Sequence, residues 1–160
     1  MVDKAAVMEA VQASLTAQIE AMRTSAEETR RAATHEEARA ENDKDTRGLE
    51  QSYLARGQAM RVEELEEAAT RLRFLDLRPF EPDEPIQLGA LVTLAVDDDE
   101  ATYFVAPAAG GTRVTIEGVE VQLVTPAAPL GRALVERHAG DDFVLRIGGR
   151  EREYEILAVA

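Results

Sequence analysis

The stretch THEEARAENDKDTRGLEQSY, residues 34–53, lies between two segments that have the apolar spacing of amphipathic helices. Inside it the apolar residues become sparse and charged side chains dominate. On both sides of it, apolar residues recur three and four positions apart. Residues 1–78 contain no Pro, which would break a long helix. The pattern therefore predicts an antiparallel hairpin of two helices over residues 1–78.

Both apolar stripes are narrow and rich in Ala, as in the seam of a coiled coil. An arm of about 30 residues would be about 45 Å long at 1.5 Å per residue. Gly48 and Gly57 in the second arm indicate a close helix approach or a local break, and we expect Tyr53 and Leu54 to pack at the end of the hairpin. The stripes consist of Met8, Val11, Leu15, Ile19, Met22, Ala26 and Ala33, and of Val62, Leu65, Ala69, Leu72 and Leu75.

The pattern changes after residue 78. Three prolines end the helix and predict a linker over residues 79–87. From Leu88 onward the β-branched residues alternate or cluster between turn signals, and PLGRALVER, residues 129–137, is the one helical interruption. We therefore expect an α+β protein with a small, mostly antiparallel β domain and one short helix over residues 88–160. The predicted strand segments are ALVTLAV, ATYFVA, TRVTIEGVEVQLVT and REYEILAV.

Composition excludes several classes of function. The chain has 160 residues, 45% of them hydrophobic, and a formal net charge of −13, which opposes a duplex nucleic acid or an anionic membrane surface. The absence of Cys excludes disulfides, thiolate metal sites and a Cys nucleophile. There is no signal-peptide pattern and no long apolar run, so we expect a cytoplasmic protein. No nucleophile–base pair or metal-ligand spacing occurs, and His35 and His138 stand alone, so we expect no self-contained enzyme.

The second half resembles a known family. LGALVTLAVDDDEATYFV, VTPAAPLGRALVERHAGDDFVLRIGG and REYEILAV are similar to the C-terminal domain of the bacterial Gre-type (GreA/GreB) transcript cleavage and elongation factors. The block TPAAPLGRAL is the most specific element, and RVEELEEAATRLRFLD resembles the end of the family's second helix. The resemblance implies an N-terminal antiparallel coiled coil and an FKBP-like C-terminal domain.

The resemblance also implies a function. Gre-type factors dock on the rim of the secondary channel of RNA polymerase and place acidic tip residues beside the catalytic Mg²⁺. They stimulate cleavage of backtracked RNA without acting as enzymes alone. By this resemblance we expect Mg²⁺ shared with the polymerase and no stably bound cofactor, indirect contact with the nascent RNA 3′ end, and no sequence-specific DNA binding. Polymerase docking carries over to Pro129, Leu130 and Arg132.

The tip departs from the family pattern. Cleavage-competent relatives carry an Asp and a Glu three residues apart. One ungapped alignment puts Glu41 at the Asp and Lys44 at the Glu; another makes Glu41 the Glu and leaves Ala38 opposite the Asp. We therefore expect Glu41, Asp43 and Asp45 to be the tip acids that hold the shared Mg²⁺, with Glu36 and Glu37 lower on the first arm.

Several alternatives stay open. A relative that occupies the channel without cleavage, and so modulates or inhibits transcription, would share the docking and differ only at the tip. A prolyl isomerase or chaperone would need an aromatic-lined pocket, for which the β domain offers Tyr103, Phe104, Phe143 and Tyr154. A coiled-coil oligomerisation module needs no such pocket. Arg30, Arg31 and His35 would either contact RNA or, for Arg31, pair with Glu27.

Overall fold

The computed structural model describes residues 2–39 and 46–160. The chain divides into two compact units, Ala13–Glu67 and Met1–Gln12 with Ala68–Ala160. We call these the helical unit and the sheet unit. The division falls inside both long helices, and the predicted domain limits at residues 78 and 88 stay a prediction.

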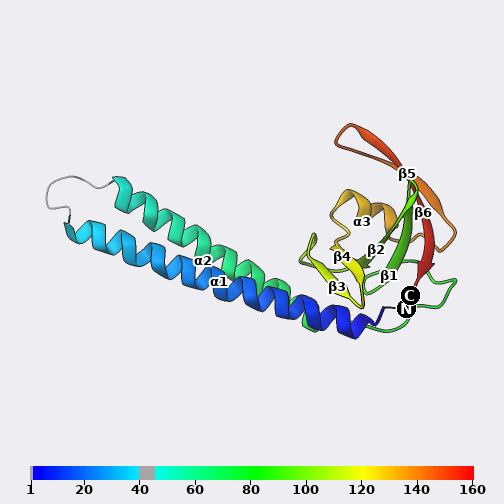
Figure 1. Ribbon diagram of the computed structural model, residues 1–160, viewed down its shortest axis with the longest axis horizontal. Coiled ribbons are helices and arrows are strands. Elements are labelled where there is room, and N and C mark those ends of the chain that lie inside the picture. Colours follow the sequence, from blue (N-terminus) through cyan, green and yellow to red (C-terminus); the bar gives the residue numbers. More distant parts are fainter. Residues whose placement is uncertain (1, 40–45) are drawn as a thin grey trace. The chain divides into compact units, whose positions relative to one another are not determined.

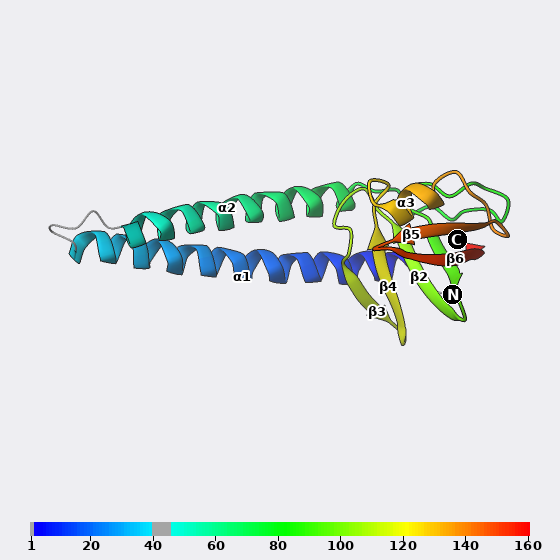
Figure 2. The same ribbon diagram turned by 90° about the horizontal axis from the view of Figure 1, so that it is seen from above.

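The helical unit is an antiparallel pair formed by most of α1 (Lys4–Arg39) and α2 (Thr46–Arg73) (Figure 1, Figure 2). Arg23 forms an ion pair with Glu66, and Gln58 Nε2 donates a hydrogen bond to Ser25 Oγ at 2.8 Å. Most members of the predicted stripes are confirmed as buried, whereas Met22 is half-buried and Leu75 lies beyond the end of α2. The buried members of the stripes in this unit are Leu15, Ile19, Ala26, Val62 and Leu65.

The expectations for Gly57, Tyr53 and Leu54 are wrong, whereas a close helix approach at Gly48 stays a prediction. The helix continues from Thr46 to Arg73, and a Cβ added at Gly57 would meet no described atom within 4 Å. Gly57 therefore marks neither a break nor a close helix approach. Tyr53 and Leu54 are 59% and 57% exposed, because the small side chain of Ala55 occupies the buried position beside them.

The sheet unit contains a six-stranded sheet in the order β3-β4-β2-β1-β6-β5. Four of its pairings are antiparallel, which confirms the expected mostly antiparallel sheet, and the pairing of β2 with β4 is parallel. The two-residue turns Glu117–Gly118 and Gly148–Gly149 have positive φ throughout, as type I′ hairpins require. The strands are β1 Leu91–Val96, β2 Asp99–Val105, β3 Arg113–Ile116, β4 Val119–Val124, β5 Asp142–Ile147 and β6 Arg150–Val159.

One face of this sheet packs with the short helix α3 (Pro129–Leu134) in a buried cluster. Phe80 and Ile86, from the predicted linker, belong to the same cluster. Ile86 exchanges main-chain hydrogen bonds of 2.8 Å with Glu136 and Arg137. The segment therefore lacks helix and strand, as expected, yet it forms part of the core. Among the described residues, no helix is both long and apolar enough to cross a membrane.

Candidate functional site

The helices on either side of the acidic stretch define the first candidate site. α1 ends at Arg39 and α2 begins at Thr46, so the predicted tip acids Glu41, Asp43 and Asp45 lie between the helix ends in the sequence but outside the described residues. At 1.5 Å per residue, the 36 residues of α1 and the 28 of α2 correspond to helices of about 54 and 42 Å. Among the described residues, no three acidic, His or Cys side chains gather as a metal site.

The interior of the hairpin becomes polar toward these helix ends. Gln58 donates to Ser25 Oγ, and Thr29 Oγ1 donates to the Ser25 carbonyl oxygen at 2.8 Å. The Gln58 Oε1 atom is buried and has no hydrogen-bond partner among the described residues. Small and polar side chains thus take part in the helix contact around Ser25, Ala26 and Gln58.

Three basic side chains in the distal part of α1, those of Arg30, Arg31 and His35, are exposed. Arg31 pairs with Glu27 at 2.8 Å, which confirms that alternative for Arg31. Arg30 and His35 are exposed and line an open groove of about 490 Å³ together with Thr34. Contact of Arg30 and His35 with RNA stays a prediction.

The docking segment carried over from the family resemblance forms α3. Pro129 begins the helix and is exposed, and so is Arg132, which donates to the Ala127 carbonyl oxygen at 3.3 Å. Leu130 is instead 9% exposed and packs in the core. Two of the three predicted docking residues are thus on the surface. The sequence left open whether Leu130 docks or packs against the sheet, and the six-residue helix turns this side chain into the core.

Gly131 allows α3 to lie close to Thr125, the residue that follows β4. A Cβ at this position would lie 1.9 Å from the Thr125 carbonyl oxygen, a main-chain atom. The Ala128 N–H also donates to that oxygen at 3.0 Å. Pro129 and Arg132 are therefore presented from a rigid turn rather than from a loose loop.

The aromatic residues of the sheet unit differ in their surroundings. Phe104 is fully buried, and Phe143 stacks on Tyr154 with ring centroids 5.1 Å apart. Arg137 covers the Phe143 ring at 4.8 Å, and burial raises the pKa of Tyr103. Phe143 and Tyr154 line a nearby open hollow of about 320 Å³, together with the four acids Asp97, Asp142, Glu153 and Glu155. Because four of the eight residues that line this hollow are acids, it differs from the mainly apolar and aromatic pocket that a prolyl isomerase needs.

A cation cluster joins the start of α1 to the segment after α2 within the sheet unit. Lys4 Nζ donates to the Arg78 carbonyl oxygen at 2.8 Å and lies 4.6 Å from the Phe80 ring centroid, while Arg78 lies 4.3 Å from it. Burial and the Arg78 charge lower the pKa of Lys4 to about 8. Hydrogen bonds from the Glu81 N–H and from Arg78 lower the pKa of Glu84.

Comparison with known proteins gives sequence relatives named transcription elongation factor GreA. The chain is 29% identical over 102 residues to transcription elongation factor GreA of Rhizobium leguminosarum bv. trifolii (strain WSM2304), a match that covers 62% of this chain and 60% of the relative. It is 31% identical over 101 residues to GreA of Xylella fastidiosa (strain M12), with the same coverage. The matches thus span about 60% of the length of these curated relatives. No family model matches the chain.

Solved structures with similar chains carry related names. GreA factor homolog 1 (Gfh1) of Thermus thermophilus is 21% identical, with a TM-score of 0.39 and coverage of 93% of this chain and 94% of that one. GreA/GreB from Nitrosomonas europaea is 18% identical, with a TM-score of 0.36 and coverage of 59% and 77%. The sequence matches confirm the resemblance drawn from the quoted motifs: this chain is similar to the Gre-type transcription elongation factors and divergent from them.

Proposed function

We propose that the protein is a transcription elongation factor that binds RNA polymerase at the rim of the secondary channel. The observation that carries the proposal is the pair of long antiparallel helices whose connection contains Glu41, Asp43 and Asp45. The sequence similarity to GreA supports it independently. In this function α3 presents Pro129 and Arg132 to the polymerase, and the helical unit delivers the acids to the active site.

The donor set at the helix connection fits Mg²⁺. Mg²⁺ prefers hard oxygen ligands and is usually held by one or two carboxylates with several waters, and the segment ENDKD, residues 41–45, offers three carboxylates. When bound, the ion would supply an activated water for attack on an RNA phosphodiester. In this proposal, the role of the chain is to hold carboxylate oxygens beside the catalytic Mg²⁺ of the polymerase. The chain does not bind that ion in the absence of the polymerase.

Two forms of this function differ at the acids. In the first, the acids stimulate cleavage of backtracked RNA. In the second, the hairpin occupies the channel and modulates or inhibits transcription without cleavage. One specific observation favours the second form: no two acids in residues 36–45 are three positions apart, the spacing of the cleavage-competent tip.

A cleavage assay on reconstituted polymerase complexes tests both forms. Backtracked RNA is incubated with the wild type, with the variant Glu41→Ala/Asp43→Ala/Asp45→Ala, and with the control Glu50→Ala/Glu63→Ala/Glu64→Ala, which loses the same charge from the exposed surface of α2. The first form predicts RNA shortening that the tip variant abolishes and the control retains. Binding to polymerase without shortening identifies the second form, and failure to bind polymerase overturns the whole proposal.

Docking is tested separately at α3. Arg132→Glu should weaken polymerase binding by about tenfold or more, because an exposed Arg at an interface centre commonly contributes over 1 kcal/mol. Arg113→Glu on β3 makes the same charge change at another exposed position and serves as the control. Equal binding by the two variants would rule out α3 as the docking segment.

A further inference from the structure

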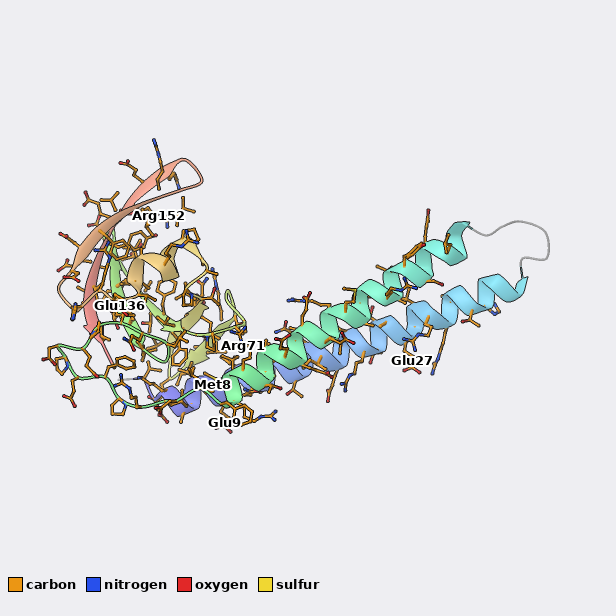
Figure 3. All side chains as sticks on the ribbon, turned by 180° about the vertical axis from the view of Figure 1, so that it is seen from behind. Met8, Glu9, Glu27, Arg71, Glu136 and Arg152 are labelled. Atoms are coloured by element: carbon orange, nitrogen blue, oxygen red, sulfur yellow. The ribbon has the colours of Figure 1, made fainter. Side chains whose placement is uncertain are left out.

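The strand β5 forms one edge of the sheet, and part of it extends as a two-stranded ribbon. Within the described residues its neighbour in the sheet order is β6 alone. β6 pairs with β1 from Tyr154 to Val159, whereas residues 150–153 pair with β5 only. The β5–β6 hairpin is seen in Figure 1, and Arg152 on it is labelled in Figure 3. An edge of this kind exposes main-chain hydrogen-bonding groups that can template another strand.

The main-chain groups that face outward from β5 belong to alternate residues. The Ile156 N–H donates to the Asp141 carbonyl oxygen at 2.8 Å, and antiparallel pairs exchange hydrogen bonds at every second residue. Phe143, Leu145 and Ile147 therefore bond toward β6, in agreement with the two-residue turn that follows Ile147. The N–H and C=O groups of Asp142, Val144 and Arg146 point away from β6.

The side chains of these three residues share one exposed face of the sheet. Successive side chains of a strand alternate between faces, so Asp142, Val144 and Arg146 lie together. All three are exposed, and Val144 is 56% exposed. Phe143 and Leu145 lie on the opposite face, where Phe143 belongs to the core and Leu145 packs against it. The edge thus carries an acid, an apolar residue and a base in a row.

We propose that this edge pairs with the β5 edge of a second copy of the chain. The two strands run antiparallel and are centred on Val144, so that the sheet continues across a two-fold axis. In this register Asp142 of each copy faces Arg146 of the other, and the two Val144 side chains meet between these ion pairs. On the opposite face, Phe143 of each copy meets Leu145 of the other.

Charge complementarity selects this partner and this register. Centring the pair on Leu145 places Val144 opposite Arg146, and centring it on Phe143 places Asp142 opposite Val144. Both shifts lose the two ion pairs, and cross-strand pairs of opposite charge or of apolar residues are the ones that stabilise a sheet. A strand from an unrelated protein has no reason to match this order. Because so short an edge buries far less area than a standard interface, the dimer should be weak and form at raised protein concentration.

Sedimentation velocity of the full chain over a range of concentrations tests the proposal. The wild type should show a reversible monomer–dimer equilibrium. Asp142→Arg and Arg146→Asp should each weaken it by about tenfold or more, because each variant opposes like charges twice. Mixing these two variants should restore association, because in the heterodimer both cross-strand pairs are again Asp with Arg. Arg152→Asp and Asp83→Arg, which make the same charge changes away from this face, should associate as the wild type does.

A proline tests the main-chain pairing itself. Val144→Pro removes the outward N–H and no hydrogen bond within the sheet, so the sheet should remain folded while association is lost. Val144→Thr keeps the N–H and the β-branched shape and should retain association. Circular dichroism confirms that both variants are folded. The proposal is overturned if the wild type stays monomeric at all concentrations, if Val144→Pro associates normally, or if mixing the charge variants restores nothing.

Discussion

At the scale of single residues, the packing of α3 depends on Gly131 having no Cβ atom. A Cβ at this position would meet the Thr125 carbonyl oxygen at 1.9 Å, so the backbone must move to admit it. We predict that Gly131→Ala lowers the free energy of unfolding by about 1–3 kcal/mol, as overpacking commonly does. Urea titration followed by circular dichroism measures this change.

The matched control is the same substitution in open space. Gly57 lies inside α2, and a Cβ there meets no described atom within 4 Å. Gly57→Ala should therefore raise the free energy of unfolding by up to about 1 kcal/mol, because Ala is the better helix former. Similar effects at the two glycines would contradict the packing described for Gly131.

Lys4 should make stability depend on pH in the alkaline range. Its pKa is lowered from 10.5 to about 8 because burial and the Arg78 charge disfavour its ammonium form, while Asp76 and Glu84 partly compensate. Between these values the unfolded chain binds more protons than the folded one, so stability from this residue rises with pH. Below pH 8 both states are protonated and the contribution is constant.

The variant Lys4→Met isolates this effect from other titrating groups. Any advantage in unfolding free energy of the variant over the wild type should shrink between pH 8 and pH 10. Urea titrations of both proteins at pH 7.0, 8.5 and 9.5 measure the difference. A difference that is constant or grows with pH would show that Lys4 is not held in the surroundings described above.

At the scale of elements, the helices were the most predictable part of the chain. Apolar residues at steps of three and four fix which face of a long helix is buried, and the structure confirms Leu15 and Leu65 in the seam. Tyr53 and Leu54 were misplaced because that expectation did not follow the spacing, which leads from Val62 back by seven residues to Ala55, 4% exposed.

A pair of leucines on α2 tests this division. Leu65 is 5% exposed and Leu54 is 57% exposed. We predict that Leu65→Ala costs about 2–5 kcal/mol of unfolding free energy, whereas Leu54→Ala stays within about 0.5 kcal/mol. Urea titration of both variants measures these changes in unfolding free energy. The two variants are matched because each removes the same atoms from a leucine of α2. A large cost at Leu54 would contradict the exposed position of this side chain on α2.

The strands were predictable where turns bracket them. Glu117–Gly118 and Gly148–Gly149 adopt the positive φ values that their sequences favour. The sequence analysis missed β5 because apolar and polar residues alternate poorly in DFVLRI. β5 also lies at the edge of the sheet, where half of its apolar residues are exposed. The parallel pairing of β2 with β4 has no local signal in the sequence. The two strands are separated along the chain by β3, and their pairing depends on the path of that whole connection.

The candidate sites were predictable in type and less so in detail. The family resemblance identified the segment that forms α3, but it could not show that Leu130 packs inward while Arg132 stays exposed. The order of charges along β5 became informative only when the pairing with β6 showed which main-chain groups face outward. A motif in the sequence can indicate a candidate docking residue. Only the exposure of its side chain in the structure shows whether a binding partner can contact it.

At the scale of the whole molecule, the two compact units divide the proposed work between them. The docking residues of α3 and the edge of β5 belong to the sheet unit, whereas the tip acids lie between the helices of the helical unit. The sheet unit is built from two pieces of chain that meet at Gln12 and Ala69, where Gln12 Nε2 donates to the Ala69 carbonyl oxygen at 2.9 Å. A short connection can therefore replace the helical unit.

We predict that a chain in which about six Gly and Ser residues replace residues 13–67 folds as the sheet unit. Such a linker spans up to about 20 Å, more than a side-chain contact requires. Because the deletion spares α3 and β5, the shortened chain should bind polymerase and compete with the full chain, and it should still self-associate. It should leave RNA cleavage and elongation unchanged, since it carries no tip acids. Competition binding and transcription assays measure these effects on the same complexes. A folded sheet unit that alters transcription as the full chain does would locate the activity outside the hairpin.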